Sequence, residues 1–228
     1  MHLEDETPDR RPAAAAAIED EYDVTVFAAR DFGSRAREMA GPDSDTDALV
    51  LFDQPAMAHK HLGEYVETVV DEVDGVDLQC WNLRKFVELL ADSNPQAIEF
   101  LHSPIRYYPE PEPIADALSA LRRYVGRNAE PLRLYHHYRS LAERNYSRYV
   151  RRTVTDGQDR YEILERRPGE WTLQAPEGEK IRIPTDDDRF RETTTDRSVS
   201  RNLTVIRGIL CARHVRRTGS VPPLSFPA

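Results

Sequence analysis

Residues 33–53 read GSRAREMAGPDSDTDALVLFD, and this stretch decides the fold. The eight residues at 23–30, DVTVFAAR, form a near-continuous apolar run, which is typical of a buried strand. ALVLFD at 48–53 is a second such run. Between the two, a glycine-serine turn opens a short helix, and GPDSDTD at 41–47 is rich in turn-forming and acidic residues. The order predicts two buried strands joined by a short helix and an acidic loop.

The next segments add a hairpin and helices. YVETVV at 65–70 and VDLQCW at 76–81 are predicted to pair as strands around Asp74-Gly75. Leu83, Phe86, Val87 and Leu90 then fall on one helix face, which Asn82 can cap. These patterns predict an α/β (α+β) fold with a small mixed sheet flanked by helices.

The outer parts of the chain differ from this core. Residues 1–20 are charged and lack an apolar period, so they are predicted to be a flexible acidic tail. The core is expected at 21–110. Residues 111–228 are predicted to form a helical lobe, with a β-hairpin insertion at about 155–195 where alternating runs and glycines replace the helical pattern.

Composition indicates an acidic, intracellular protein. The net charge is -9, and lysine occurs only at Lys60, Lys85 and Lys180, which favours a halophilic source, although a GC-rich genome would also favour arginine. No apolar run is long enough to cross a membrane, and the acidic start does not resemble a secretory signal, so a cytoplasmic location is expected. Cys80 and Cys211 are predicted to be buried free thiols.

Three aspartates carry the candidate chemistry. Asp45 and Asp47 are two residues apart at the entry to a strand, so both point to one face of the sheet. In VDLQCW, Asp77 alternates away from the apolar face. If these strands are neighbours, three carboxylates converge, and Mg²⁺ (or Mn²⁺) would relieve their repulsion. The alternative is a solvated acidic turn, which an acidic, halophile-like chain makes stronger.

Gly33 and Ser34 are a candidate phosphate cradle. Glycine lets a triphosphate approach the backbone, and backbone N–H groups and the Ser34 hydroxyl can donate to phosphate oxygens. A Gly-Ser pair alone is more often an ordinary turn. Arg35, which follows, joins this candidate nucleotide site.

The motifs together resemble a known family. Strand, Gly-Ser, short helix, SDTD, strand and a third aspartate occur in the order of the DNA polymerase β nucleotidyltransferase superfamily. The chain looks closest to predicted nucleotidyltransferases sometimes encoded beside RNA ligases, over roughly residues 24–150 and 200–226. The motifs that carry this resemblance are GSRA, PDSDTD, VDLQCWNLRKF, SNPQAIEFLHSPI, LYHHYRSLAERNY, LTVIRGILCARHV and the final PP-x-x-F.

The resemblance implies roles for individual residues. Gly33 and Ser34 would hold the nucleotide phosphates, and Asp45 and Asp47 would bind metal. Asp77 would complete the metal site and help to activate the attacking hydroxyl. The family's chemistry implies transfer of a nucleoside monophosphate from an NTP to a hydroxyl acceptor.

Some positions depart from the branch. Arg37 and Glu38 stand where it usually carries Trp-Gly after GSRA, and Cys80 and Asn82 replace the usual Gly and Asp around the tryptophan. These changes bear on nucleotide preference and acceptor.

Three further cations are weaker candidates for nucleotide binding. Arg84 and Lys85 lie off the apolar face of their helix, and an exposed cationic face explains them equally well. Arg207 lies beside a predicted stripe of Leu203, Ile206 and Leu210, where a surface salt bridge is the alternative.

The sequence therefore predicts a metal-dependent nucleotidyltransferase. RNA ends are the acceptor by analogy with the branch, and an RNA ligase is an expected partner; a protein hydroxyl or a small molecule stays open. The main alternative is a catalytically silent nucleotide- or RNA-binding module of the same fold, which Arg37-Glu38 favours. An acidic structural domain is a further alternative, in which the three aspartates would not converge.

Overall fold

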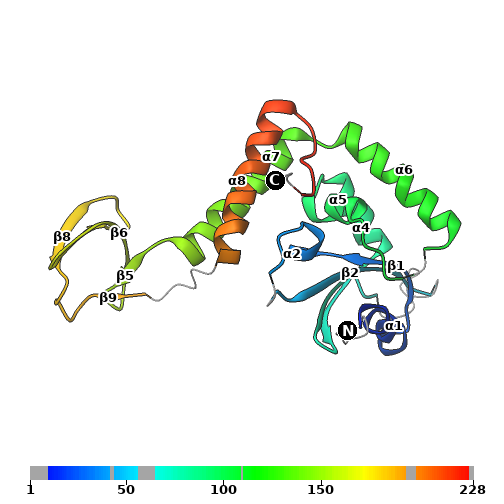
Figure 1. Ribbon diagram of the computed structural model, residues 1–228, viewed down its shortest axis with the longest axis horizontal. Helices are drawn as coiled ribbons and strands as arrows, with labels where there is room; N and C mark the ends of the chain where they lie inside the picture. Colours follow the sequence, from blue (N-terminus) through cyan, green and yellow to red (C-terminus); the bar gives the residue numbers. More distant parts are fainter. Residues whose placement is uncertain (1–9, 42–43, 56–64, 109, 194–198, 226–228) are drawn as a thin grey trace, which may run out of the picture. The chain divides into compact units, whose positions relative to one another are not determined.

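The computed structural model of the protein describes residues 10–41, 44–55, 65–108, 110–193 and 199–225. The chain forms two compact units, one of residues 1–138 with 210–228 and the other of residues 139–209 (Figure 1). None of the helices in the described ranges combines the length and the apolar character that a membrane crossing needs.

The first unit is built on a mixed four-stranded sheet of order β1-β2-β4-β3. β2 pairs antiparallel with β1 and parallel with β4, and β3 pairs antiparallel with β4. The predicted fold class is confirmed. The strands are β1 (Thr25–Asp31), β2 (Thr46–Asp53), β3 (Thr68–Val73) and β4 (Val76–Asn82).

The predicted β3–β4 hairpin forms at Asp74-Gly75. Both residues have positive φ, 53° and 77°, as a two-residue turn of the type that matches strand twist requires. Asp tolerates this conformation and Gly adopts it without cost, so the turn fixes the register that pairs Val73 with Val76.

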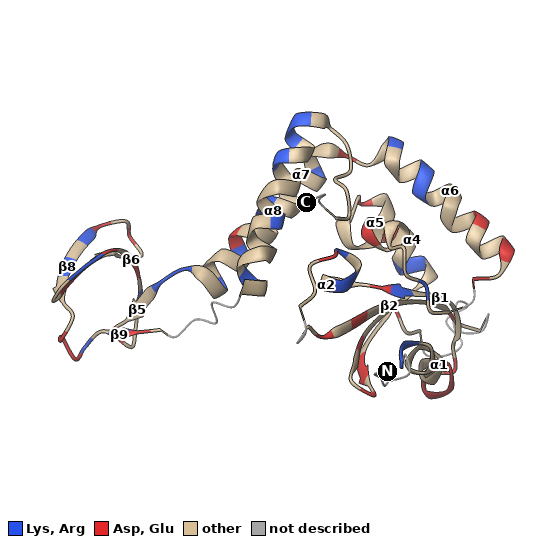
Figure 2. Ribbon diagram, in the orientation of Figure 1, with Lys and Arg blue, Asp and Glu red and all other residues tan. Residues whose placement is uncertain are grey.

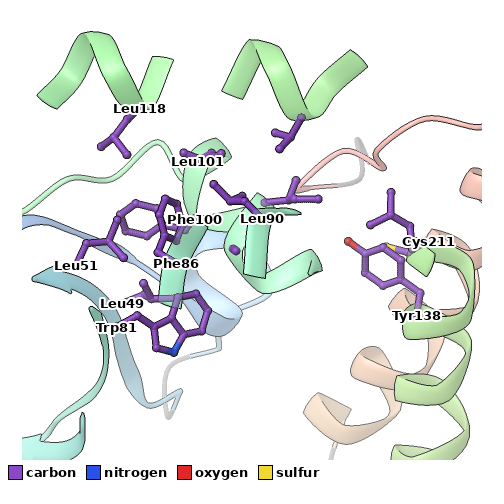
Figure 3. Close-up of a cluster of buried hydrophobic side chains, with 14 of the residues drawn as sticks. Leu49, Leu51, Trp81, Phe86, Leu90, Phe100, Leu101, Leu118, Tyr138 and Cys211 are labelled. Atoms are coloured by element: carbon purple, nitrogen blue, oxygen red, sulfur yellow. The ribbon is translucent and has the colours of Figure 1, made fainter. Parts of the chain in front are cut away.

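Helices cover both faces of this sheet (Figure 1). α4 (Leu83–Ala91) and α5 (Pro95–His102) share one apolar cluster with the sheet side chains Leu49, Leu51 and Trp81 (Figure 3). Asn82 caps α4 as predicted, since its side-chain oxygen accepts from the Arg84 N–H at 3.0 Å. The cluster extends to residues of α6 (Glu112–Asn128), α7 (Pro131–Asn145) and α8 (Val199–Thr218).

The opposite face of the sheet is covered by a helix that the sequence did not predict. α1 (Arg11–Tyr22) occupies half of the expected flexible tail, and its Ala14, Ala15 and Ile18 are fully buried in a second cluster. The alanine run showed no apolar periodicity in the sequence, so it did not indicate a buried helix. The small alanine side chains nevertheless let α1 approach the sheet closely. The first nine residues of the predicted tail lie outside the described residues.

The second unit contains more than the predicted hairpin. Its antiparallel sheet has five strands in the order β8-β7-β6-β5-β9, around a small core of Val154, Trp171, Leu173 and Ile183. A lone hairpin is marginal in water, and the added strands supply the missing apolar face. The strands are β5 (Thr153–Thr155), β6 (Arg160–Arg167), β7 (Glu170–Gln174), β8 (Lys180–Pro184) and β9 (Arg191–Glu192).

The buried face of α8 differs from the predicted stripe. Leu203, Ile206 and Leu210 are 37%, 51% and 40% exposed, whereas Cys211 and Val215 are buried. The helix carries two apolar stripes, and the one with small residues is the one that packs. The prediction for this face is therefore wrong.

Candidate functional site

Two of the three predicted aspartates meet on neighbouring strands. Asp47 on β2 and Asp77 on β4 are direct partners in the parallel register. Side chains alternate along a strand, so Asp47 shares the face of Leu49 and Leu51, and Asp77 shares the face of Trp81. Because those three apolar residues lie in one cluster, both carboxylates leave the sheet on the same side, next to each other.

The surroundings of Asp47 disfavour its charge. Burial raises the pKa of Asp47 above its ordinary value, and the Asp77 and Asp45 carboxylates raise it further, whereas the Arg37 guanidinium lowers it. No residue that the structure describes donates a hydrogen bond to the Asp47 carboxylate. A half-buried anion beside like charges and without donors is a group that a cation would stabilise.

This environment predicts a gain in stability when the charge is removed. A carboxyl with a raised pKa binds protons more readily in the folded protein, so the free energy of unfolding falls as the pH rises through the folded pKa. Without divalent ions at neutral pH, Asp47→Asn should melt about 2–4 °C higher, the shift of ~1 kcal/mol in a chain of this size. Scanning calorimetry at neutral and acidic pH measures this, and the gain should shrink at acidic pH. A variant that melts lower at neutral pH contradicts the unfavourable environment.

Asp45 lies in the exposed loop that leads into β2. Arg35 holds this loop, since its guanidinium donates to the carbonyls of Ser44 at 3.0 Å and Asp45 at 3.4 Å. The Arg35 guanidinium thus donates to the backbone at and next to Asp45, the candidate metal ligand. Among the described residues, no three His, Cys, Asp or Glu side chains are placed to hold a metal ion by themselves. A cation here needs further ligands from a substrate or water.

Gly33 lies against the Asp47 carboxylate. Its φ is +69°, and a Cβ atom there would lie 2.0 Å from Asp47 Oδ2. Glycine is therefore required both by the backbone and by the space. It opens α2 (Gly33–Ala36), which is one turn long, so any phosphate cradle rests on individual N–H groups and not on a helix dipole. The Ser34 hydroxyl makes no hydrogen bond to a described residue.

Arg37 fastens α2 to α5. Its guanidinium donates twice to Glu99 Oε2, at 3.0 and 2.8 Å, and lies over the Phe32 ring. Glu99 is 7% exposed, and its other oxygen accepts from the Tyr138 hydroxyl at 3.3 Å. Arg37 is thus a structural link in this chain, where the related branch usually has tryptophan.

Glu38 adopts the left-handed conformation, with φ of 57°. Glycine, which the related branch usually carries here, adopts this conformation without steric cost, whereas an L side chain is strained. Glu38→Gly should therefore raise the free energy of unfolding by about 0.5–1 kcal/mol, part of the relief being lost to the greater freedom of glycine in the unfolded chain. Urea unfolding checks this. Glu38→Ala removes the same exposed carboxylate and keeps the Cβ, so it should give no such gain.

Two of the other predicted cations, Arg84 and Lys85, are paired with glutamates. Arg84 pairs with Glu88 at 3.0 Å and Lys85 with Glu67 at 3.3 Å, and the Arg84 side chain is 67% exposed. Arg207 is 5% exposed, so the surface salt bridge considered for it is excluded. It belongs to the other compact unit, and its part in nucleotide binding stays a prediction.

Sequence reasoning missed Asp31, the last residue of β1. Asp31 is 1% exposed, and its Oδ1 accepts from the Tyr107 hydroxyl at 2.8 Å and from Arg11 at 3.2 Å. Its Oδ2 is buried and has no partner among the described residues. Asp31 also raises the pKa of Asp47. The only signal in the sequence is a charge that ends an apolar strand just before the Gly33 turn.

The chain resembles known proteins over most of its length. A family model described as RlaP, RNA repair pathway DNA polymerase beta family, matches residues 9–228. The chain is 26% identical over 211 residues to "Uncharacterized protein YcgL" of Bacillus subtilis (strain 168), covering 92% of this chain and 63% of that protein. It is also similar to a solved nucleotidyltransferase-like protein from Exiguobacterium sibiricum 255-15, at 16% identity over 60% of this chain and 50% of that one. The TM-score is 0.32, too low to carry an argument.

Proposed function

Because this chain belongs to the RNA repair pathway DNA polymerase beta family, we propose that it transfers a nucleoside monophosphate from an NTP to a hydroxyl group, with an RNA end as the acceptor. The family is the one that the motifs around Asp45, Asp47 and Asp77 had indicated. This chain covers 63% of the length of the Bacillus subtilis relative. An activity that needs the full length of such a relative is therefore also only proposed for this chain.

The observation that supports the proposal is the Asp47–Asp77 pair beside Gly33. The two carboxylates are register partners on one face, and the lack of a side chain at Gly33 leaves the space that the Asp47 carboxylate occupies. Phosphoryl-type transfer needs carboxylates for divalent cations and a backbone that phosphates can approach. Both requirements fall within this small region of β2, β4 and α2.

The proposed reaction forms one bond and breaks one. The oxygen of the acceptor hydroxyl attacks the α-phosphorus of the NTP, and the bond from that phosphorus to the oxygen bridging to the β-phosphate breaks. Pyrophosphate leaves with the electron pair, and the hydroxyl proton passes to the Asp77 carboxylate. Asp77 is exposed at the edge of the site, where an acceptor can approach it.

The donor set fits a divalent cation that arrives with the nucleotide. Mg²⁺ in nucleotide sites takes one or two carboxylates and fills its shell with phosphate oxygens and water. That pattern agrees with the absence of a three-residue metal cluster among the described residues. Asp45 and Asp47 would hold the cation, which when bound neutralises charge on the triphosphate. Mn²⁺ suits the same ligands.

The test is pyrophosphate release. The purified protein is mixed with Mg²⁺ and each NTP in turn, with an RNA that ends in free 2′ and 3′ hydroxyls. The matched control is the same RNA ending in a 2′,3′-cyclic phosphate, which offers neither hydroxyl. Release that depends on the free hydroxyls supports the proposal. Mg²⁺-dependent NTP binding without transfer to RNA, protein or small-molecule acceptors would favour a silent binding module.

A further inference from the structure

A basic and aromatic segment begins in the last two residues of helix α7 and continues beyond it, in the second unit. Residues 144–152 read RNYSRYVRR, which is four arginines and two tyrosines without an acidic residue. Residues Tyr146–Val150 form a π-helical turn, closed by the Arg151 N–H donating to the Tyr146 carbonyl at 2.8 Å. Such turns are rare and often occur at functional sites. Figure 2 shows the basic stretch that enters β5 in blue.

The charge of this unit differs from that of the whole chain. Residues 139–209 hold 15 of the 31 lysines and arginines but 13 of the 40 aspartates and glutamates. This unit therefore carries a net charge of +2, and the rest of the chain carries -11. A short segment rich in arginine attracts anions locally, even though the chain as a whole is acidic.

Three of the four arginines have no carboxylate partner within the part of the chain that the structure describes. Arg144, Arg148 and Arg152 are exposed, and none forms an ion pair with a residue that the structure describes. Only Arg151 is paired, with Glu162. The charges are thus left available to a ligand.

Some arginines of the neighbouring sheet are neutralised by a carboxylate, and others are not. Arg167 pairs with Glu165 at 3.0 Å, and Arg189 pairs with Asp187 at 2.8 Å. Arg166 pairs with Glu192. Arg160, Arg182 and Arg191 of the same sheet are exposed and form no ion pair with a described residue. The segment 144–152 is therefore distinguished by its density of arginine and tyrosine without an acidic residue.

Aromatic rings lie among these charges. The guanidinium carbons of Arg148 and Arg201 lie 5.2 and 4.3 Å from the centroid of the Tyr149 ring, so two like charges flank one ring. Tyr146 is 44% exposed. An exposed tyrosine face suits the stacking of an unpaired base.

We propose that residues 144–152, together with Arg201 of α8, form a binding surface for single-stranded RNA. Phosphates would contact Arg144, Arg148 and Arg152, and a base would stack on Tyr146. The proposal rests on the proposed function only for the choice of RNA over other polyanions. The surface lies wholly within residues 139–209, whereas the aspartates belong to the other compact unit.

Fluorescence anisotropy of a labelled single-stranded RNA tests the surface, without NTP and without Mg²⁺. Arg148→Ala combined with Arg152→Ala should weaken binding by at least about tenfold. The slope of log affinity against log salt should shrink by about 1.4, since each lost phosphate contact on a single strand contributes about 0.7. The matched control combines Arg167→Ala with Arg189→Ala, which removes two paired arginines from the same unit. The control should change binding less than about threefold.

Tyr146 provides a second readout. Tyr146→Ala should weaken RNA binding by about fivefold or more, because base stacking on an aromatic ring is lost, whereas Tyr146→Phe should retain it. Equal losses in the arginine variants and in their control overturn the proposal, as does a wild type that binds no RNA. Equal affinity for single-stranded DNA of the same sequence overturns the choice of RNA. Mg²⁺–NTP binding is measured on the same variants and should not change, so failure of this surface is distinguishable from failure of the proposed reaction.

Discussion

Gly33→Ala should abolish most of the transfer activity, with a loss of at least about 100-fold. The added methyl group would lie 2.0 Å from Asp47 Oδ2 and 2.7 Å from its carboxyl carbon, so the Asp47 side chain must leave its position. A displacement of about 1 Å in a catalytic arrangement is enough for a loss of that size. The positive φ adds backbone strain of about 1–2 kcal/mol. Steady-state pyrophosphate release measures the effect, with calorimetry to follow the folded state.

Gly75 offers a matched control for the strain alone. Its φ is +77°, close to that of Gly33, and a Cβ atom there would meet nothing within 4 Å. Gly75→Ala should thus lose a similar amount of stability and keep transfer within about threefold of wild type. If Gly33→Ala and Gly75→Ala lose the same activity, the contact with Asp47 has no role in the reaction.

The parts of the fold that could be predicted from sequence are those with strong local signals. Long valine- and leucine-rich runs indicated β1 and β2, and Asp74-Gly75 indicated the hairpin through its turn chemistry. Asn82 was predicted as a cap because its side chain acts within two residues. In each case the interaction that fixes the element lies within the element or next to it.

The parts that could not be predicted depend on distant partners. α1 is stabilised by burial of alanines against the sheet, and alanine has no strong apolar signal of its own. β9 has two residues and exists because β5 pairs with it. The face of α8 that packs was set by its neighbours, not by which stripe is more apolar.

The candidate site shows the same division. Asp47 and Asp77 could be assigned to one face from strand alternation, although only the register shows that they are partners. Asp31 was missed because its importance comes from Arg11 and Tyr107, which are far away in sequence and bury its carboxylate. The contact of Gly33 with Asp47 is equally invisible, since it depends on how closely α2 approaches β2.

Asp77→Asn should separate catalysis from nucleotide binding. The change keeps size and shape and removes the negative charge that would receive the proton of the attacking hydroxyl. Loss of a general base costs about 10²–10⁴ in rate, so transfer should fall by at least about 100-fold. Mg²⁺–NTP binding should stay within about tenfold, which is 1.4 kcal/mol, because Asp45 and Asp47 would still hold the cation. Titration calorimetry and pyrophosphate release measure the two quantities separately.

Asp74→Asn is the control for the loss of one acidic charge. Asp74 lies three residues before Asp77, in the β3–β4 turn with φ of 53°, a conformation that asparagine tolerates well. Its replacement removes the same charge from the same hairpin without touching the aspartate pair. Both binding and transfer should remain near wild type. A loss of transfer here similar to that of Asp77→Asn would mean that general electrostatics, and not proton acceptance at Asp77, limits the reaction.

Asp45→Asn completes the comparison, because it is expected to act on the cation. It should weaken Mg²⁺-dependent NTP binding by more than about tenfold and lower transfer as well, since a ligand to the metal is lost. The two aspartate variants therefore predict opposite patterns, binding retained for Asp77→Asn and binding lost for Asp45→Asn. If both variants lose binding equally, Asp77 is a metal ligand first and the assignment of the proton to it fails. If Mg²⁺ makes no difference to nucleotide binding in the wild type, the aspartates do not hold a cation, and the pairing of Asp47 with Asp77 needs another explanation.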